Sequence, residues 1–407
     1  MPFLQLDIHP VLATVYAVVL YAAAWLVASA LTRLPSVAQH VTKSGGRYGA
    51  LDGFRGVLAV GVFVHHSFVA DVYFQTGRWE WTSSPLLNHL GQTTVALFFM
   101  ITGFLFALKA MSPRIDWKAL YVSRVARLFP LYALIVLIVF AAVMTLSGGV
   151  LHQPPMQLLK ELLQWLAFVC FGRPDINAFP MTQTLIAGVN WSLRYEVFFY
   201  AVAVPALFVA SRWLSSRAML WASLAVLALL LLVRFKLQQA DGHLLFASHF
   251  LCGIVVACAY RQPQWLESMR RATFRWLAGA SVLLLYFLVS AYGSVAIAIT
   301  LLLFAAVVGG LSVFGLFHTR AALWLGDISY GIYLIHGLVL YATLSMLRAS
   351  GNLASLGAVG YGLVMCVVAA VVVGLASASY IFLELPIMAR LKKWSTARRM
   401  PVAVKPA

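Results

Sequence analysis

Charged residues are scarce throughout this sequence. Asp, Glu, Lys and Arg together make up 10% of its 407 residues, whereas 62% belong to the hydrophobic set. A soluble domain of ordinary composition carries about 25% charged residues, so this chain has too little charge to fold as a globule of its length in water. A lipid bilayer is the solvent that suits this composition.

Two other features are also missing. None of the four cysteines has CxxC spacing and all lie in apolar runs, so the sequence supports neither a metal site nor a disulfide framework. Lys and Arg are absent before Arg33, and the first apolar run lacks a small-residue cleavage site. We therefore expect a retained first helix and not a cleaved signal peptide.

Eleven apolar runs are present, each close to the roughly 20 residues that an α-helix needs to cross hydrocarbon. They are continuous and show no ten-residue alternation, which favours an all-α, polytopic membrane helical bundle over a barrel. A shorter run from Leu162 to Phe171 predicts a re-entrant or interfacial piece. The long runs are 11–32, 50–70, 91–111, 120–147, 190–211, 217–233, 243–260, 274–292, 294–317, 323–347 and 357–383.

The net charge of +17 follows the loops and does not form one basic patch, so membrane topology explains it better than nucleic-acid binding does. Twenty of the 29 Lys and Arg fall around every second loop, and six fall around the others. Because basic residues favour the cytoplasmic side, this asymmetry predicts an N-terminus outside and a C-terminus inside. The odd number of helices agrees with that orientation.

Several ionisable residues stand inside the apolar run 50–70. Eleven residues separate Arg55 from His66, about three helical turns or 16 Å, so both lie on nearly one face. Asp52 falls on the same stripe, whereas His65 points about 100° away. Charge within hydrocarbon costs at least ~3 kcal/mol, so such residues usually line a cavity or pair. A polar path leading inward is the functional interpretation, and a buried ion pair with a core histidine is the structural one.

Two later runs begin with polar pairs at helical spacing. Arg124 and Arg127 share one face and could bind phosphate, although juxtamembrane arginines often serve only as topology signals or lipid contacts. Ser192 and Glu196 lie one turn apart, and Trp191 stands on another face. An interfacial aromatic anchor with a paired acid is the alternative interpretation of this second group.

Polar residues recur near the end of the chain. Ser329, Tyr333 and His336 form one stripe of a predicted helix, which indicates either a site or hydrogen bonds between helices. Glu384 ends the last apolar run, and an acid at that depth could pair with Arg55 or Arg127.

Six of these segments, in order over residues 51–386, resemble the motifs of the acyltransferase-3 family of bacterial integral membrane acyltransferases. They are Arg55 and His66 with ten residues between them, Phe98 to Leu105, Arg124-x-x-Arg127, Trp191-Ser192-Leu193-x-x-Glu196, Leu325 to His336, and Glu384-x-Pro386. Thr102 stands where the family usually has Ser. One predicted helix precedes the family's usual ten-helix core.

The resemblance implies a domain organisation and a reaction. Residues 1–49 would be an extra transmembrane helix and a basic cytoplasmic loop, 50–390 the acyltransferase-3-like membrane domain, and 391–407 a basic cytoplasmic tail. The protein would be a multi-pass enzyme of the bacterial inner membrane, an O-acetyltransferase-like acyltransferase. It would take an acyl group, most often acetyl, from cytoplasmic acyl-CoA as donor substrate to a hydroxyl of a surface or exported glycan or of a lipid-linked saccharide. No bound cofactor and no metal are expected.

Roles for individual residues come from the resemblance and the spacing together. His66 would be the general base or would carry the acyl group itself, with Arg55 at the cavity mouth. Phosphates of the donor would contact Arg124 and Arg127. Asp52, in the donor site, and Glu384 would orient the arginines. Glu196 would bind the acceptor or help to deprotonate it, and Trp191 would offer a flat surface to a sugar ring. The remaining candidates are Ser192 for the acceptor, Thr102 or Tyr333 for the oxyanion, and His336 in support.

Other functions remain open at this point. Intramembrane His, Glu and Arg also build the paths of proton-coupled transporters, although no repeat between halves is visible. A non-catalytic scaffold in an envelope assembly is a further possibility. Among enzymes, a small secondary metabolite could replace the glycan as acceptor.

Overall fold

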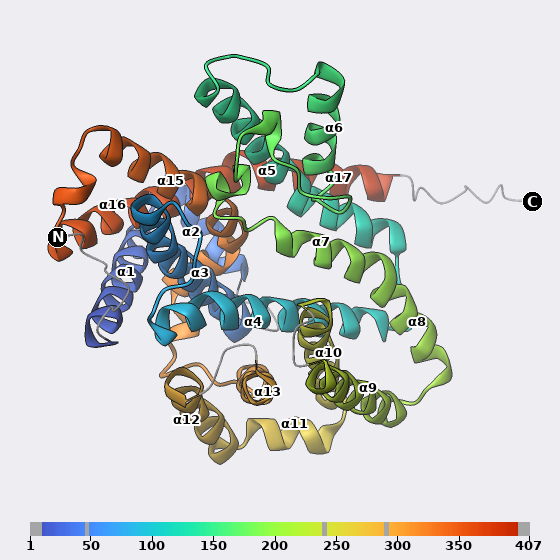
Figure 1. Ribbon diagram of the computed structural model, residues 1–407. Helices are drawn as coiled ribbons and strands as arrows, with labels where there is room; N and C mark the ends of the chain where they lie inside the picture. Colours follow the sequence, from blue (N-terminus) through green and yellow to red (C-terminus); the bar gives the residue numbers. More distant parts are fainter. Residues whose placement is uncertain (1–9, 45–48, 238–241, 289–292, 398–407) are drawn as a thin grey trace, which may run out of the picture.

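The computed structural model describes residues 10–44, 49–237, 242–288 and 293–397. Helices make up 83% of it, and the described residues contain no β-strand. The first third of the chain forms α1 (Pro10–Leu31), α2 (Pro35–Ser44), α3 (Gly49–Thr76), α4 (Pro85–Ala110) and α5 (Trp117–Leu146). The predicted all-α helical bundle is confirmed (Figure 1).

The remaining two thirds contain more short elements. The middle of the chain forms α6 (Pro155–Leu166), η1 (Ile176–Ala178), η2 (Thr182–Ile186), α7 (Trp191–Phe198), the π-helical turn η3 (Phe199–Ala203), α8 (Val204–Trp213), α9 (Ser216–Lys236) and α10 (Gly242–Tyr260). The last part forms α11 (Pro263–Arg270), α12 (Ala272–Leu288), α13 (Ser294–Val308), η4 (Leu316–His318), α14 (Arg320–Asp327), α15 (Ser329–Ala349), η5 (Leu353–Ser355), α16 (Ala358–Ser379), the π-helical turn η6 (Tyr380–Glu384) and α17 (Leu385–Ala397).

Nine helical segments of the described residues are long and apolar enough to cross a membrane. They correspond to nine of the eleven predicted runs. The other two, α12 and α13, are apolar but shorter. The predicted run 274–292 ends at residues 289–292, which lie outside the described part of the chain, as do residues 398–407 of the predicted basic tail.

Two predicted boundaries are wrong. The run 294–317 is helical only to Val308, because Gly309 and Gly310, the latter at φ 104°, end α13. The run 323–347 is divided at Ile328 into α14 and α15. The short run from Leu162 to Phe171, predicted as a re-entrant or interfacial piece, contains the end of α6 at Leu166 and Phe168 with a left-handed backbone at φ 56°.

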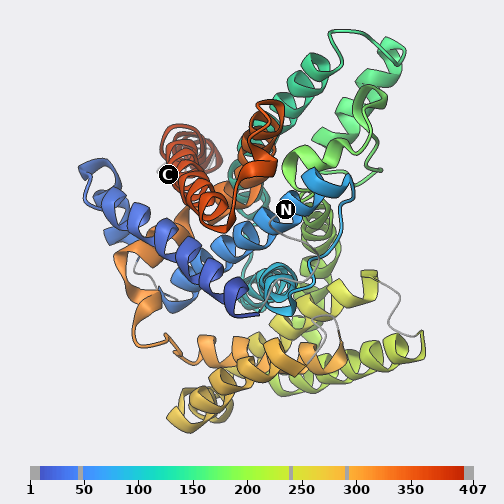
Figure 2. The same ribbon diagram turned by 60° about the vertical axis from the view of Figure 1, so that its left-hand side comes forward.

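Helix α3 is the centre of the bundle, packed against α4, α14 and α15 (Figure 1). The helix that precedes the predicted core, α1, lies against α16 and α14. Helices α9 to α13 form the lower layer of both views, coloured olive to orange (Figures 1 and 2). Polar side chains such as His65, Ser67 and Asp71 in this helix are therefore buried among other helices.

Glycine allows α4 and α10 to pack closely. A Cβ atom on Gly103 would lie 2.2 Å from the carbonyl oxygen of Phe250, and one on Gly253 would lie 2.1 Å from that of Met100. Contact between backbones at small residues is a common way for membrane helices to associate, since lipid provides little hydrophobic force between them. This contact fixes α4, which carries Thr102 and Lys109, against the lower layer.

Candidate active site

A cavity of about 660 Å³ lies between α3, α4, α5, α7, α15 and α17. Its lining includes five basic side chains, Arg55, Lys109, Arg124, Arg127 and Lys392. Two acids, Glu196 and Asp327, also line it. A cavity with more cations than anions inside a helical bundle is suited to an anionic ligand.

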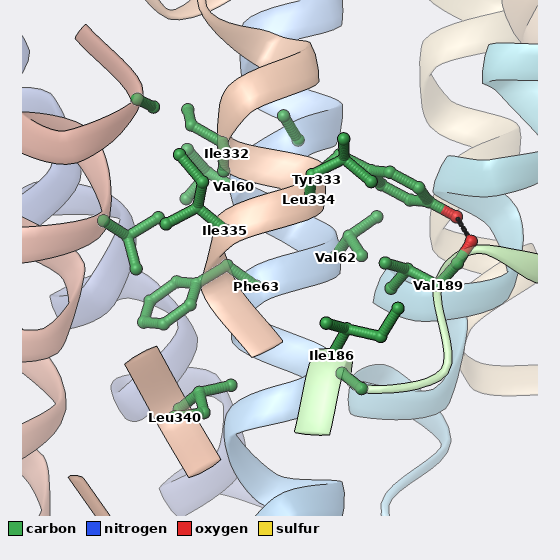
Figure 3. Close-up of a cluster of buried hydrophobic side chains, with 14 of the residues drawn as sticks. Val60, Val62, Phe63, Ile186, Val189, Ile332, Tyr333, Leu334, Ile335 and Leu340 are labelled. Carbon is green, nitrogen blue, oxygen red and sulfur yellow. Dashed lines mark hydrogen bonds between the residues drawn. The ribbon is translucent and has the colours of Figure 1, made fainter. Parts of the chain in front are cut away.

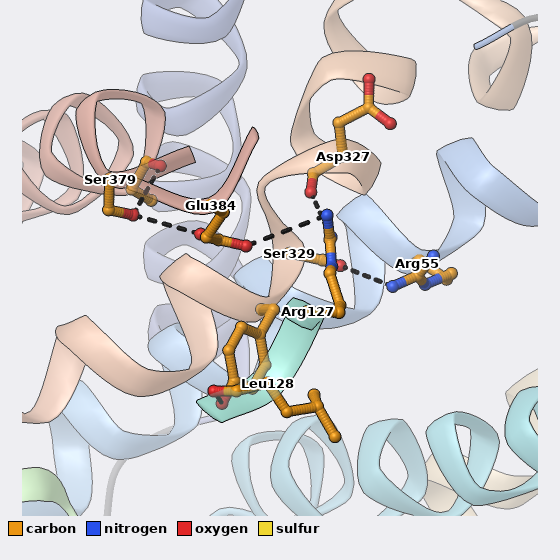
Figure 4. A network of polar contacts seen from close by, with 9 residues as sticks. Arg55, Arg127, Leu128, Asp327, Ser329, Ser379 and Glu384 are labelled. Carbon is orange, nitrogen blue, oxygen red and sulfur yellow. Dashed lines mark hydrogen bonds and ion pairs between the residues drawn. The ribbon is translucent and has the colours of Figure 1, made fainter. Parts of the chain in front are cut away.

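Arg55 and Arg127 enter the cavity from different helices and meet at the start of α15 (Figure 4). The Nη2 atom of Arg55 donates to the Ser329 hydroxyl at 3.3 Å, and that of Arg127 donates to the Asp327 carbonyl at 2.6 Å. Asp52, one turn before Arg55, does not line the cavity. Of the three residues of the predicted stripe on α3, Arg55 lines the cavity, whereas Asp52 and His66 do not.

Glu384 pairs with Arg127, one of the two partners that the sequence left open. Their charged atoms lie 3.8 Å apart, and the Glu384 side chain is only 1% exposed. Ser379 donates to the other carboxylate oxygen at 3.4 Å (Figure 4). The Arg127 guanidinium also lies 5.1 Å from the centre of the Tyr380 ring. Arg127 is therefore held in a network, and Arg124 lies over the Phe106 ring, 5.2 Å from its centre.

Glu196 lies in the same cavity as these arginines. It accepts hydrogen bonds from Thr102 at 3.3 Å and from Tyr200 at 2.9 Å. Two hydroxyl donors stabilise a carboxylate that the bilayer would otherwise disfavour. The sequence assigned Glu196 to the acceptor, and in the structure it lines the same cavity as the arginines assigned to the donor.

Tyr333 and Ser192 lie at the end of the cavity away from Lys109 and Lys392. Their hydroxyl oxygens are 2.7 Å apart, and Tyr333 also donates to the Val189 carbonyl at 2.9 Å. Figure 3 shows the Tyr333 side chain directed at Val189, across the apolar cluster between α3 and α15. These two hydroxyls are therefore tied to the loop before α7.

His66 and His336 form a pair just beyond this point. Nδ1 of His66 lies 3.1 Å from Nε2 of His336, and their rings stack with centroids 5.0 Å apart. Nδ1 of His336 lies 2.9 Å from the Ile332 carbonyl, so it must carry the proton. Nε2 of His336 then accepts, and Nδ1 of His66 donates. Nε2 of His66 is left with a lone pair, and no described residue bonds it.

The histidine pair is not part of the cavity lining. His336 follows Tyr333 on α15, and the centres of their rings lie 6.3 Å apart. Tyr333 and Ser192 thus stand between the cavity and the imidazoles. The sequence predicted a path that ends at His66, and the structure shows the described cavity ending about one residue layer before it.

Trp191 has a different environment from the one the sequence suggested. Its ring packs against Phe246 with centroids 4.6 Å apart, and also contacts Phe99 and Tyr195. Phe246 lies against the ring at an interplanar angle of 38°, and Trp191 is half-buried among these neighbours.

Lys109, Lys392 and Tyr200 line the cavity but were not predicted as site residues. The two lysines lie near the ends of apolar runs, where a charge looks like a topology signal. Their only distinguishing feature is tertiary position, which sequence spacing does not show.

The fold and the cavity define a class, helical membrane proteins with a largely apolar internal cavity into which several cationic side chains point. The family model described as "Acyltransferase domain", Acyl_transf_3, matches residues 48–378, and the chain belongs to this acyltransferase-3 family. It is therefore a multi-pass membrane acyltransferase. No curated protein and no solved structure matches the chain.

Proposed function

We propose that this acyltransferase moves an acetyl group from cytoplasmic acetyl-CoA to a hydroxyl of a surface or exported glycan, across the bacterial inner membrane. The observation that carries the proposal is the stripe Ser329, Tyr333 and His336 on α15. Ser329 at one end of this stripe accepts a hydrogen bond from Arg55 in the cationic cavity, and His336 at the other end is hydrogen-bonded to the His66 imidazole.

The orientation is inferred from the basic residues. With the N-terminus outside, the end of α4 and the start of α17 lie in the cytoplasm, and so do Lys109 and Lys392. The cavity then opens toward the compartment that holds acyl-CoA. The loop between α3 and α4 then faces the outside of the cell. The extra helix α1 and the loop that continues to residue 49 precede the membrane domain, which spans residues 50–390.

The donor end would use the cations. Phosphates of CoA carry several negative charges, and charge-assisted hydrogen bonds from Arg and Lys are the strong ones. Arg124, Lys109 and Lys392 are the cations on the cytoplasmic part of the lining. Arg55 lies deeper in the cavity. Asp52, one turn before Arg55, and Glu384, which pairs with Arg127, would keep the two arginines oriented. The pantetheine arm would extend along the cavity to Tyr333.

Transfer would take place between Tyr333 and His66. Nε2 of His66 accepts the proton of the acceptor hydroxyl, whose oxygen then attacks the thioester carbonyl. The C–S bond breaks and the CoA thiolate leaves, taking the proton from the imidazolium. Tyr333 or Thr102 would donate to the developing oxyanion, after its hydroxyl proton turns away from the Val189 carbonyl or the Glu196 carboxylate that accepts it in this structure. His336 holds the required tautomer of His66, and Ser192 and Glu196 complete the polar surroundings.

Membership of the family favours acyl transfer over the transporter and scaffold interpretations. The test is mass spectrometry of cell-surface polysaccharide from cells with the wild-type protein, with none, and with His66→Ala or Arg55→Ala. We expect acetylation only with the wild type, at equal protein levels in the membrane. His152→Ala, in the loop before α6, is the matched control and should retain acetylation.

Two outcomes would contradict this. Acetylation that persists in both variants would remove the proposed site. Acetylation that is absent from the polysaccharide of wild-type cells but present on a secreted small molecule would move the acceptor to secondary metabolism.

A further inference from the structure

The loop between α3 and α4 brings two tryptophans onto two adjacent histidines. The ring of Trp79 stacks on His66 at 28°, with centroids 6.2 Å apart. Trp81 lies on His65 at 37°, with centroids 5.5 Å apart. The histidines meet edge to face at 4.9 Å. Four rings thus form one assembly beside the C-terminal half of α3.

A hydrogen bond at Nδ1 holds each histidine of this assembly in place. Nδ1 of His65 donates to the Leu87 carbonyl at 2.8 Å, which anchors its ring to the first turn of α4. Gly91 faces that ring, and a Cβ there would lie 2.4 Å from it. His66 is held by His336 in the same way. His65, which the sequence placed away from the site, therefore supports Trp81.

The loop itself is rigidly built. Asn88 donates to the Thr82 carbonyl at 2.7 Å and accepts from the Thr82 backbone at 3.2 Å. The Ser84 hydroxyl caps α4 by accepting from Leu87. These bonds hold the part of the loop that follows the two tryptophans against the start of α4.

One tryptophan remains accessible. Trp81 is 55% exposed, and Trp79 is half-buried between exposed neighbours in the loop. Trp191, by contrast, is occupied by aromatic packing. An ordinary interfacial tryptophan contacts lipid headgroups and needs no partner in the protein. Trp79 is instead turned inward onto the imidazole whose Nε2 has the lone pair.

We propose that Trp79 and Trp81 form the acceptor subsite, a platform for the ring of a carbohydrate that presents a hydroxyl to Nε2 of His66. A sugar ring has an apolar C–H face and polar edges, which matches aromatic surfaces that carry a few directed polar groups. His65 is a positioning residue for Trp81. This inference rests on the proposed function and names the surface that recognises its acceptor.

The test separates acceptor from donor. The full-length protein in nanodiscs is given radiolabelled acetyl-CoA and, as acceptor probe, polysaccharide extracted from cells that lack the protein. Trp79→Leu and Trp81→Leu should each raise the KM for polysaccharide roughly five- to tenfold, with the KM for acetyl-CoA within twofold. The Phe variants, which keep a flat ring, should recover most of the loss.

Trp213→Leu is the control, because Trp213 is 84% exposed and lies at the end of α8. An unchanged KM for polysaccharide in both Leu variants would overturn the platform and make the tryptophans interfacial anchors. If Trp79→Leu fails to accumulate, the KM of Trp81→Leu for polysaccharide tests the platform by itself, because the exposed Trp81 side chain can be replaced without disturbing the fold. A wild-type protein that transfers nothing to polysaccharide would refute the proposed function instead.

Discussion

Ser329 and His336 lie seven residues apart on α15, and each contacts one end of the Arg55 to His66 stripe of α3. Positions i and i+7 return to the same face of a helix, so one face of α15 reaches both groups. A shift of α15 would therefore disturb the arginine and the imidazole together. This relationship makes α15 the natural place to test the proposed chemistry without changing either group.

Replacing His336 removes one of the two groups that Nδ1 of His66 contacts. We expect His336→Ala to lower kcat about 100-fold, because the imidazole is then held only by the Val62 carbonyl of its own helix, 3.1 Å from Nδ1, and loses the support of α15. His336→Gln keeps an acceptor atom and should retain more activity. Steady-state kinetics with acetyl-CoA and polysaccharide measure this. A kcat within twofold of wild type for His336→Ala would exclude the pair from the reaction.

Removing Arg124 or Lys109 should weaken the binding of phosphate only. Arg124→Ala and Lys109→Ala are each expected to raise the KM for acetyl-CoA about tenfold, since a charge-assisted hydrogen bond is lost. The KM for S-acetylpantetheine, which carries no phosphate, should stay unchanged. Lys118→Ala is the control, because Lys118 does not line the cavity. Equal effects on both donors would argue for a structural role.

Glu384→Ala should destabilise the protein by leaving Arg127 buried without its acid. Breaking a buried pair costs about 3 kcal/mol, and here the Asp327 carbonyl still binds the arginine, so the loss should be at or below that value. Thermal unfolding in detergent should show a clearly lower Tm. Glu267→Ala, which breaks an exposed pair with Arg271, should leave the Tm unchanged. Equal Tm values for the two variants would contradict the importance of the buried network.

The contact between α4 and α10 leaves no room for a methyl group. Gly253→Ala would place Cβ 2.1 Å from the Met100 carbonyl, so the helices must separate and the variant should accumulate poorly in the membrane. Gly374→Ala on α16 meets nothing within 4 Å and should accumulate normally. Quantitative immunoblotting of membranes compares them. Normal levels of Gly253→Ala would show that α10 can move.

The spacing of apolar and polar residues predicted most of the long helices, because the length of an apolar run and the helical repeat are local properties of the sequence. The run 50–70 became the central helix α3, and the polar stripe of Ser329, Tyr333 and His336 does face other helices. The end of α13 was misplaced because the run continues past Gly309 and Gly310 in apolar residues. Apolar composition there did not predict a break in the backbone.

The site features that the sequence did not predict depend on neighbours that only the folded structure brings together. The partner of Trp191 is Phe246, which lies on a different helix, so its packing was invisible in the local motif. Trp79 stood in an unremarked loop, and only the return of the chain onto His66 gives it a place at the proposed site. Lys109 and Lys392 looked like signals of orientation, and their convergence on one cavity depends on how α4 and α17 pack.

The two π-helical turns, η3 and η6, each stand beside an acid, Glu196 in one case and Glu384 in the other. A π turn holds one residue more than an α turn would, and such insertions are frequent at functional sites. Deleting a single residue from η6 should let the helix close into regular α geometry while α16 and α17 keep their relative orientation, because the wide turn absorbs the extra residue locally. The widened turn that ends at Glu384 would then be lost, so one extra amino acid shapes this corner of the chamber without displacing the helices on either side of it.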